Sequence, residues 1–148
     1  MGRVNAELGE KVYLDTNIII YAVEGFVELE DQIHALLQAI DDAEIIAVTS
    51  ELAVAEVLVK PLKDQNRKVQ QAYKTFLTPT FALQIVPITL AVLEDAAYLC
   101  AMTKLKLPDA IHLATAKISG CDCLLTNDIL FKSVDVSNIR ILSEIALF

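Results

Sequence analysis

Short apolar runs alternate along the chain with longer segments whose apolar residues recur at helical spacing. The runs, rich in β-branched and aliphatic residues, span residues 11–15, 45–49, 83–88, 123–127 and 138–143. Each run has the length of a strand and is mostly apolar on both faces, as strands are in a parallel sheet covered by helices on either side. We therefore predict an α/β fold, a three-layer α/β/α sandwich with a central parallel sheet of about five strands.

Helical periodicity is clearest in residues 27–43, where apolar residues recur three and four positions apart. This stripe consists of Ile33, Leu36, Leu37 and Ile40. A second helix is expected over residues 50–60, capped by Thr49 or Ser50 and ending before Pro61. Further helices are expected over residues 64–77, 89–106 and 108–120.

The composition indicates one globular domain. A length of 148 residues suits a single core, with the polar residues 1–10 as a loose N-terminal extension. With 55% apolar and 22% charged residues, the composition excludes a disordered chain. The sequence contains neither an apolar run of about 18 residues, as a membrane span requires, nor a secretory signal at its N-terminus. We therefore expect a cytoplasmic protein without a membrane segment.

The three cysteines are expected to be reduced structural thiols. Cys100, Cys121 and Cys123 form no C-x-x-C pair, and no histidines are placed to complete a zinc site with them. Their odd number also argues against a disulfide framework.

Acidic residues stand where two of the predicted strands end. Asp15 closes the first strand, and Asp128 follows the fourth. In open α/β sheets, ligands bind outside the carboxyl ends of the strands, so both acids are placed for a binding site. Asp109 follows Pro108 in the first turn of a predicted helix. Each of these acids taken alone is also typical of a helix cap or first helical turn.

Glu56 is the only charged residue between Leu52 and Val59. A carboxylate on so apolar a helix face is partly desolvated, which is unfavourable unless the group is paired or binds a metal ion. An ion pair with Lys60, four residues later, is the structural alternative. His112, three residues after Asp109, is on much the same helix face and could touch the site, but we expect a packed, hydrogen-bonded histidine.

If the four acids converge, each close pair of carboxylates costs on the order of 4 kcal/mol at 4 Å and an effective dielectric constant of about 20. Such a cluster requires raised pKa values or a bound cation. Ligation by oxygen alone selects Mg²⁺ or Mn²⁺ over zinc. A hard divalent ion can hold a phosphate oxygen and activate a water molecule, which is the chemistry of phosphodiester hydrolysis.

Four segments of the chain together resemble a known family. They read, in order, LDTNIIIYA, AEVL, LPDAIHLATA and LLTNDILF. This order resembles the PIN-domain ribonucleases, and most closely the VapC-like toxins of type II toxin–antitoxin systems, over about residues 11–143. The resemblance implies a catalytic acidic quartet made of Asp15, Glu56, Asp109 and Asp128. Asp15 and Asp109 would be the metal ligands, supported by Asn17 and Thr126, for which turn and cap chemistry is an equally good interpretation.

The resemblance further implies an RNA substrate, one or two Mg²⁺ or Mn²⁺ ions, a homodimer, and a small antitoxin protein as partner. The net charge of −8 is unusual for a nucleic-acid-binding protein. RNA contacts would therefore rely on the metal and on local basic residues, unless these are only solvated surface. The candidates are Lys60, Lys63 and Arg67 beyond the Glu56 helix, and Lys104 and Lys106 before Asp109.

We thus predict a metal-dependent endoribonuclease, and three alternatives remain. A receiver-like Mg²⁺-binding signalling domain needs a second acid after its first strand and a lysine after its fifth, but Thr16 follows Asp15 and residues 138–143 contain no lysine. A haloacid-dehalogenase-type phosphatase needs an aspartate where this chain has Asn17. A non-catalytic α/β binding module, whose acids merely cap helices, is the third.

Overall fold

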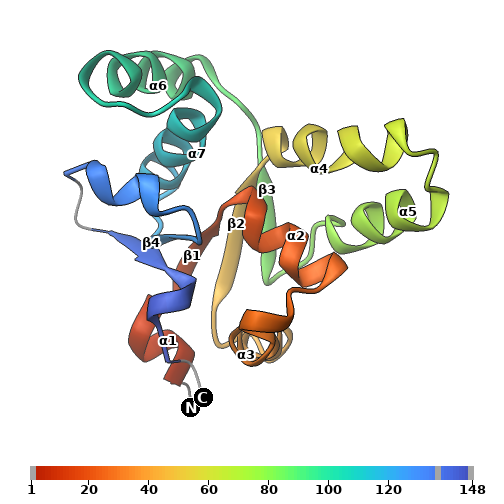
Figure 1. Cartoon of the computed structure of the whole chain (residues 1–148). Coiled ribbons are helices and arrows are strands. Elements are labelled where there is room, and N and C mark those ends of the chain that lie inside the picture. The colour runs from red at the N-terminus through yellow and green to blue at the C-terminus, as the bar shows by residue number, and fades with distance from the viewer. Residues whose placement is uncertain (1–2, 136–137, 147–148) are drawn as a thin grey trace.

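A five-stranded parallel sheet forms the centre of the part of the chain that the computed structural model describes, residues 3–135 and 138–146 (Figure 1). The strand order is β3-β2-β1-β4-β5. The strands are β1 (Lys11–Leu14), β2 (Ile46–Ser50), β3 (Leu83–Val86), β4 (Cys123–Thr126) and β5 (Ile139–Ile141). Each lies within one of the five predicted apolar runs or one residue beyond it, so the predicted sheet is confirmed.

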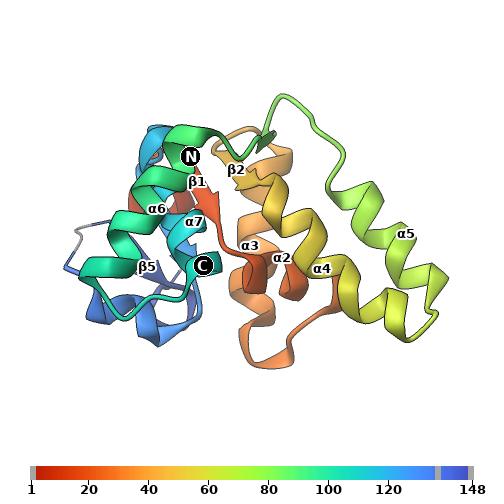
Figure 2. The ribbon, with the colours of Figure 1, turned by 90° about the horizontal axis from the view of Figure 1, so that it is seen from above.

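Helices cover both faces of this sheet, as the three-layer prediction requires. They are α1 (Arg3–Leu8), α2 (Thr16–Glu24), α3 (Glu30–Asp41), α4 (Glu51–Lys63), α5 (Arg67–Phe76), α6 (Leu90–Met102) and α7 (Leu107–Ile118). Seen from above, α6 and α7 lie on one side of the strands, and α2, α3 and α4 lie on the other (Figure 2). Helices α4 and α5 form a hairpin that extends away from the sheet (Figure 2).

Alternating side chains of the strands supply a separate core on each face of the sheet. Val12 and Leu14 of β1 are buried on the face of α2 and α3, together with Ile18. Tyr13 is buried on the opposite face, where it packs with Ala110 and other residues of α7. Strand β1 is therefore apolar on both faces because helices cover both faces. Its neighbours pair with it in parallel, and Val12 lies opposite Ala47 of β2 and Cys123 of β4.

Several helix boundaries differ from those predicted; α6, for example, ends at Met102 rather than at residue 106. Two of the differences have a clear physical reason. Residues 3–8 belong to the segment expected to be loose, but they form α1, whose Val4 and Leu8 are buried in the core. These two residues are four positions apart and so share one helix face. Helix α4 does not end before Pro61 but continues to Lys63. Pro61 lies in the last turn of the helix, so its missing N–H removes a single hydrogen bond near the end rather than breaking a long helix.

The entry into β1 is fixed at the amino edge of the sheet. The Asp122 carboxylate accepts hydrogen bonds from the backbone N–H groups of Glu10 (2.8 Å) and Lys11 (3.0 Å). Gly9, which precedes them, has a φ of 87° that favours glycine. In the described part of the chain, no helix is long and apolar enough to cross a membrane.

Candidate metal centre

Asp15 lies directly after β1, at the carboxyl edge of the sheet, and its side chain is only 4% exposed. Its carboxylate accepts hydrogen bonds from the backbone N–H of Thr16 (2.9 Å), the amide of Asn17 (3.2 Å) and the hydroxyl of Thr126 (2.7 Å). Burial raises the pKa of Asp15, although the hydrogen bonds from Thr126 and Thr16 oppose the shift. The strand thus ends in a carboxylate that is withdrawn from water and held in one orientation.

Asn17 and Thr126 tie the start of α2 to the loop after β4. The Asn17 amide donates to the Thr126 hydroxyl (3.1 Å), and its side-chain carbonyl accepts from the backbone N–H of Asn127 (3.1 Å). The Thr126 oxygen also accepts from the backbone N–H of Asp128 (3.0 Å). Both residues proposed from the sequence as supports therefore contact Asp15 directly, and they also fix the position of Asp128 relative to it.

Glu56 faces into the molecule and does not pair with Lys60. Its Oε1 accepts a hydrogen bond from the Thr16 hydroxyl (2.7 Å) and lies 2.6 Å from Nε2 of His112. Lys60 instead pairs with Asp64, at 2.8 Å. Burial raises the pKa of Glu56, but the hydrogen bonds from His112 and Thr16 outweigh it, so the net pKa is lowered.

Asp109 and Asp128 complete the group from two further elements. Partial burial raises the pKa of Asp109, and the negative charges of Asp15 and Asp128, and to a lesser degree of Glu56, raise it further. Asp128 follows β4, and its carboxylate accepts a hydrogen bond from the backbone N–H of Leu130 (3.0 Å). The four acids are therefore close enough to act on one another electrostatically.

The donor set suits a hard divalent cation. All the candidate ligands are carboxylate oxygens, which Mg²⁺ and Mn²⁺ prefer, and a cation would relieve the mutual repulsion that raises the pKa of Asp109. As they stand, no three His, Cys, Asp or Glu side chains within residues 3–135 and 138–146 converge as a ready-made metal site. Asp15 and Asp109 are the candidates to hold the ion, while Glu56 is turned toward His112.

Comparison with known proteins identifies the family. The model of the PIN domain matches residues 12–137, most of the chain. The chain belongs to the PIN domain family. Among curated proteins, none matches this PIN domain.

Solved structures share the fold of this PIN domain. A chain of a toxin–antitoxin complex from Klebsiella pneumoniae is 26% identical, with a TM-score of 0.66, over 88% of this chain and 97% of that chain. A chain of VapBC2 from Rickettsia felis, crystallised bound to a DNA fragment from its promoter, is 19% identical, with a TM-score of 0.70, over 88% of this chain and 97% of that chain. The sarcin–ricin loop cleaving toxin VapC20 from Mycobacterium tuberculosis is 13% identical, with a TM-score of 0.65, over 87% of this chain and 98% of that chain. At identities this low, the similarity to VapBC2 and VapC20 concerns the fold alone. The PIN-domain membership inferred from the four sequence segments is thereby confirmed, and the solved structures similar to this chain include VapC proteins.

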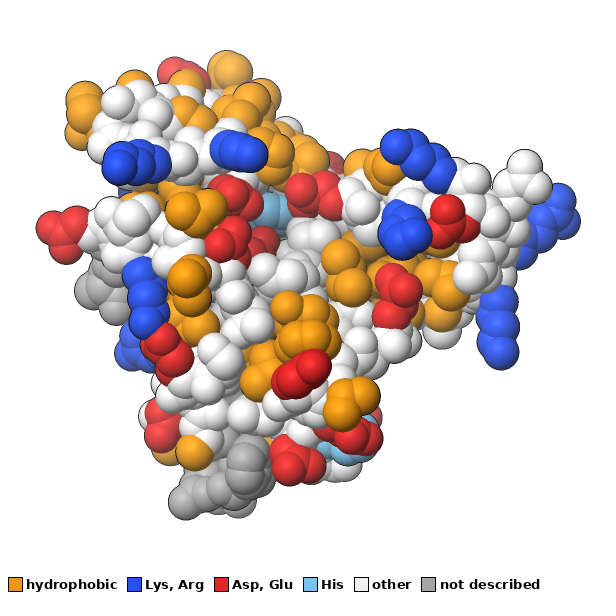
Figure 3. All heavy atoms as spheres, viewed as in Figure 1, with side chains coloured by type: hydrophobic (Ala, Val, Ile, Leu, Met, Phe, Trp, Pro, Cys, Tyr) orange, Lys and Arg blue, Asp and Glu red, His pale blue; other side chains and the backbone are white. Residues whose placement is uncertain are grey.

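The acids of this PIN domain lie in a hollow between two lobes. In Figure 3, Asp and Glu side chains gather between the lobe of α6 and α7 and the hairpin of α4 and α5, with Lys and Arg side chains on both flanks. The basic residues proposed from the sequence are exposed on these two lobes: Lys60, Lys63 and Arg67 on the hairpin, and Lys104 and Lys106 between α6 and α7. Lys60 is already paired with Asp64, which reduces its availability for phosphate.

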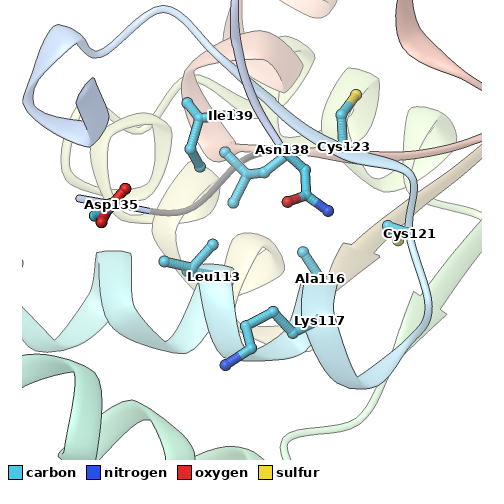
Figure 4. A pocket seen from close by; sticks show the side chains of 9 residues that line it. Leu113, Ala116, Lys117, Cys121, Cys123, Asp135, Asn138 and Ile139 are labelled. Carbon is cyan, nitrogen blue, oxygen red and sulfur yellow. The ribbon is translucent and has the colours of Figure 1, made fainter. Parts of the chain in front are cut away.

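A separate pocket lies on another side of α7 (Figure 4). It has a volume of about 600 Å³, is bordered by Leu113, Lys117, Cys121 and Cys123, and has Asp135 as its only acidic residue among the described lining. Burial raises the pKa of Cys121 to about 11 and that of Cys123 to about 12, so both stay protonated. They are free thiols, as the sequence predicts. The cavity is thus not part of the acidic centre.

Thr16 and His112 contact Glu56 but were not predicted as site residues, and neither was Tyr13, which contacts His112. His112 is buried and hydrogen-bonded, as expected, but its partner is the candidate site acid Glu56. The position of His112 three residues after Asp109 on α7 was the available signal. Thr16 stands between the two residues of the Asp15–Asn17 pair and faces Glu56 rather than solvent.

Proposed function

We propose that this PIN domain is a metal-dependent endoribonuclease that hydrolyses phosphodiester bonds in RNA, and that it is the toxin of a toxin–antitoxin pair. The observation that carries the proposal is electrostatic. Asp15, Glu56, Asp109 and Asp128 come from four different parts of the chain, yet the pKa of Asp109 is raised first by its partial burial and then by the charges of the other three acids. A protein gains nothing in stability from such an arrangement, whereas a bound divalent cation turns it into a binding site.

The residues divide the work of hydrolysis among them. Bound Mg²⁺ or Mn²⁺ supplies a positive charge for a phosphate oxygen and lowers the pKa of a water molecule. Asp15 and Asp109 hold the ion, and Asn17 and Thr126 keep the Asp15 carboxylate in its orientation. Glu56, whose pKa is lowered, stays ionised at neutral pH and accepts hydrogen bonds from the site.

The flanks of the hollow are suited to a single RNA strand. Lys and Arg side chains lie on both flanks of the acids (Figure 3). Lys63 and Arg67 are exposed on the hairpin of α4 and α5, and Lys104 and Lys106 are exposed between α6 and α7. A strand that crosses the hollow would have its backbone held on either side while the scissile phosphate lies at the metal. Because the protein is acidic overall, the ion and these few cations must provide the attraction.

The partner proposals rest on the structural relatives. Chains similar to this one were solved within toxin–antitoxin complexes. A small antitoxin that places an Arg or Lys against the acids would block the metal site. Helix α6 also carries exposed apolar side chains, with Leu90 73%, Tyr98 62% and Met102 66% exposed, which supports a protein-binding surface for a homodimer or the antitoxin.

A non-catalytic binding module is the second candidate, because two of the acids do cap helical segments. Asp15 accepts from the N–H of Thr16 at the start of α2, and Asp128 accepts from that of Leu130. Capping explains neither the partly buried Glu56 nor the placement of Asp109 beside the other carboxylates.

The two functions are separated by an RNA cleavage assay. We expect the wild type to cut mixed RNA in Mg²⁺ or Mn²⁺, and we expect EDTA or Asp15→Asn to abolish the cleavage. Asp41→Asn, an exposed acid at the end of α3, is the matched control and should cleave like the wild type. Cleavage that persists in EDTA and in Asp15→Asn would exclude a metal nuclease and point to a contaminating enzyme.

A further inference from the structure

His112 is almost fully buried, 1% exposed, and both of its ring nitrogens have partners. Nδ1 lies 2.6 Å from the hydroxyl of Tyr13 in β1. Nε2 lies 2.6 Å from Oε1 of Glu56 in α4 and 3.1 Å from the hydroxyl of Thr16 in α2. A single side chain of α7 thus connects the central strand to two helices of the opposite layer at the edge of the hollow.

The partners determine which nitrogen carries hydrogen. An ionised carboxylate can only accept hydrogen bonds, so Nε2 must donate to Glu56 at this distance. The Tyr13 phenol carries hydrogen at neutral pH and lies 2.6 Å from Nδ1, so it can donate to that nitrogen. Tyr13 in this way selects the tautomer of His112 that has hydrogen on Nε2.

The same contacts leave the two oxygens of Glu56 in different states. Oε1 accepts both the His112 N–H and the Thr16 O–H. Among the described residues, none donates a hydrogen bond to Oε2. The Glu56 carboxylate is therefore held by one oxygen, with the other left for a ligand in the hollow.

We propose that His112 is a positioning residue of the metal centre, which together with Thr16 fixes Oε1 of Glu56 so that only Oε2 is presented to the ion or its bound water. Tyr13 supports this role by holding His112 in the donating tautomer. The inference rests on the proposed metal-dependent function. According to this inference, Glu56 contacts the ion or its bound water through Oε2 alone. A carboxylate without such hydrogen bonds could bind the ion through both oxygens.

Two substitutions of similar size separate the two sides of the histidine. In His112→Gln the amide nitrogen can reach the position of Nε2 and still donate to Glu56. In His112→Asn the shorter amide lies near the position of Nδ1, keeps the Tyr13 contact and cannot reach Glu56. Because both variants lose the buried ring, a purely structural role of His112 would affect them alike.

The test measures Mn²⁺ binding to the RNA-free protein by calorimetry. We expect His112→Asn to weaken Mn²⁺ affinity by about tenfold or more, as loss of a residue that orients a metal ligand does, and His112→Gln to stay close to the wild type. Introducing His112→Asn into Glu56→Gln should cause no further loss, because the residue acts through Glu56. Equal losses in both variants, or independent losses in the double variant, would overturn the inference.

Nitrogen NMR of the imidazole in the metal-free wild type provides a readout that requires no variant to fold. We expect the spectrum to show hydrogen on Nε2 of His112. An Nε2 without hydrogen could not donate to Glu56 and would refute the proposed positioning role. Wild-type protein that binds no Mn²⁺ at all would instead contradict the proposed metal-dependent function, so the two failures are distinguishable.

Discussion

At the scale of single residues, the acids of the hollow differ in the sign of their contribution to stability. The pKa of Asp109 is raised by burial and by Asp15 and Asp128, whereas that of Glu56 is lowered by His112 and Thr16. A carboxyl group with a raised pKa stabilises the native state at low pH, and this contribution is lost as the pH rises through its folded pKa. A carboxyl group with a lowered pKa stabilises at neutral pH, and its contribution is lost as the pH falls.

These signs predict opposite behaviour of two variants in the absence of metal. Asp109→Asn should melt higher than the wild type at pH 7, by roughly 2–4 °C for each kcal/mol of relieved repulsion, and the gain should shrink toward about pH 4. Glu56→Gln should melt lower than the wild type at pH 7, and that difference should also shrink as the pH falls. Thermal melts across this range are the measurement, and two variants displaced in the same direction at pH 7 would show that the acids are not coupled as described.

Added Mg²⁺ is the control for this experiment. A saturating ligand at about one hundred times its Kd stabilises a protein by about 2.7 kcal/mol. We expect the wild type to gain stability with Mg²⁺ and Asp109→Asn to lose that response. Glu51→Gln, an exposed acid in the first turn of the same helix as Glu56, should respond like the wild type.

At the scale of elements, the strands and the acids at their ends were predictable from sequence, since both depend on local pattern. The five apolar runs need only a strand length and apolar residues on both faces. Asp15 and Asp128 follow from the rule that parallel strands gather their carboxyl ends at one edge. The helix over residues 3–8 was missed because its only apolar signal is Val4 and Leu8, whose burial depends on contacts with the distant core.

The contacts of Tyr13, Thr16 and His112 could not be predicted, since together with Glu56 they join four elements, β1, α2, α4 and α7. His112 is 99 positions from Tyr13 and 56 from Glu56, and the side chains meet only after β1 and α7 have packed together. The sequence pairs Glu56 with Lys60 by helical spacing, but the packing of α4 turns Glu56 inward and leaves Lys60 to Asp64. Local spacing therefore proposes partners, and tertiary packing selects among them.

The junction of α1 and β1 provides a prediction about element geometry. A Cβ added to Gly9 would lie 2.4 Å from Cβ of Asp122, and its φ of 87° strains other residues. Gly9→Ala should therefore lower the free energy of unfolding by more than the roughly 1 kcal/mol that a positive φ costs alone. Gly25 has the same φ of 87° with no atom within 4 Å of an added Cβ, but its ψ of 153° lies in a region that glycine alone adopts readily, so Gly25→Ala reports a backbone cost without a steric one. A loss of no more than about 1 kcal/mol in Gly9→Ala, measured by denaturant unfolding, would show that Asp122 yields without penalty.

At the scale of the whole molecule, the charge distribution is unusual for a protein proposed to act on RNA. The net charge is −8, yet the cations near the acids lie on the two lobes that flank the hollow. The long-range field therefore repels RNA, and binding depends on local contacts made after encounter. Such a surface favours accessible single strands over non-specific binding to any duplex.

This distribution predicts a shallow salt dependence. About two simultaneous phosphate contacts to a single strand change the affinity by less than tenfold between 50 and 200 mM salt, whereas six to ten contacts change it by several orders of magnitude. We expect the smaller change for Asp15→Asn, which permits binding measurements without cleavage. Removing both Lys104 and Lys106 should weaken binding and flatten the slope further, because those lysines would account for part of the contacts. Replacing Lys117, a basic residue beside the separate pocket, should leave the RNA affinity and its salt dependence unchanged. A steep slope in Asp15→Asn that survives the double lysine change would locate the RNA-binding surface elsewhere on the molecule.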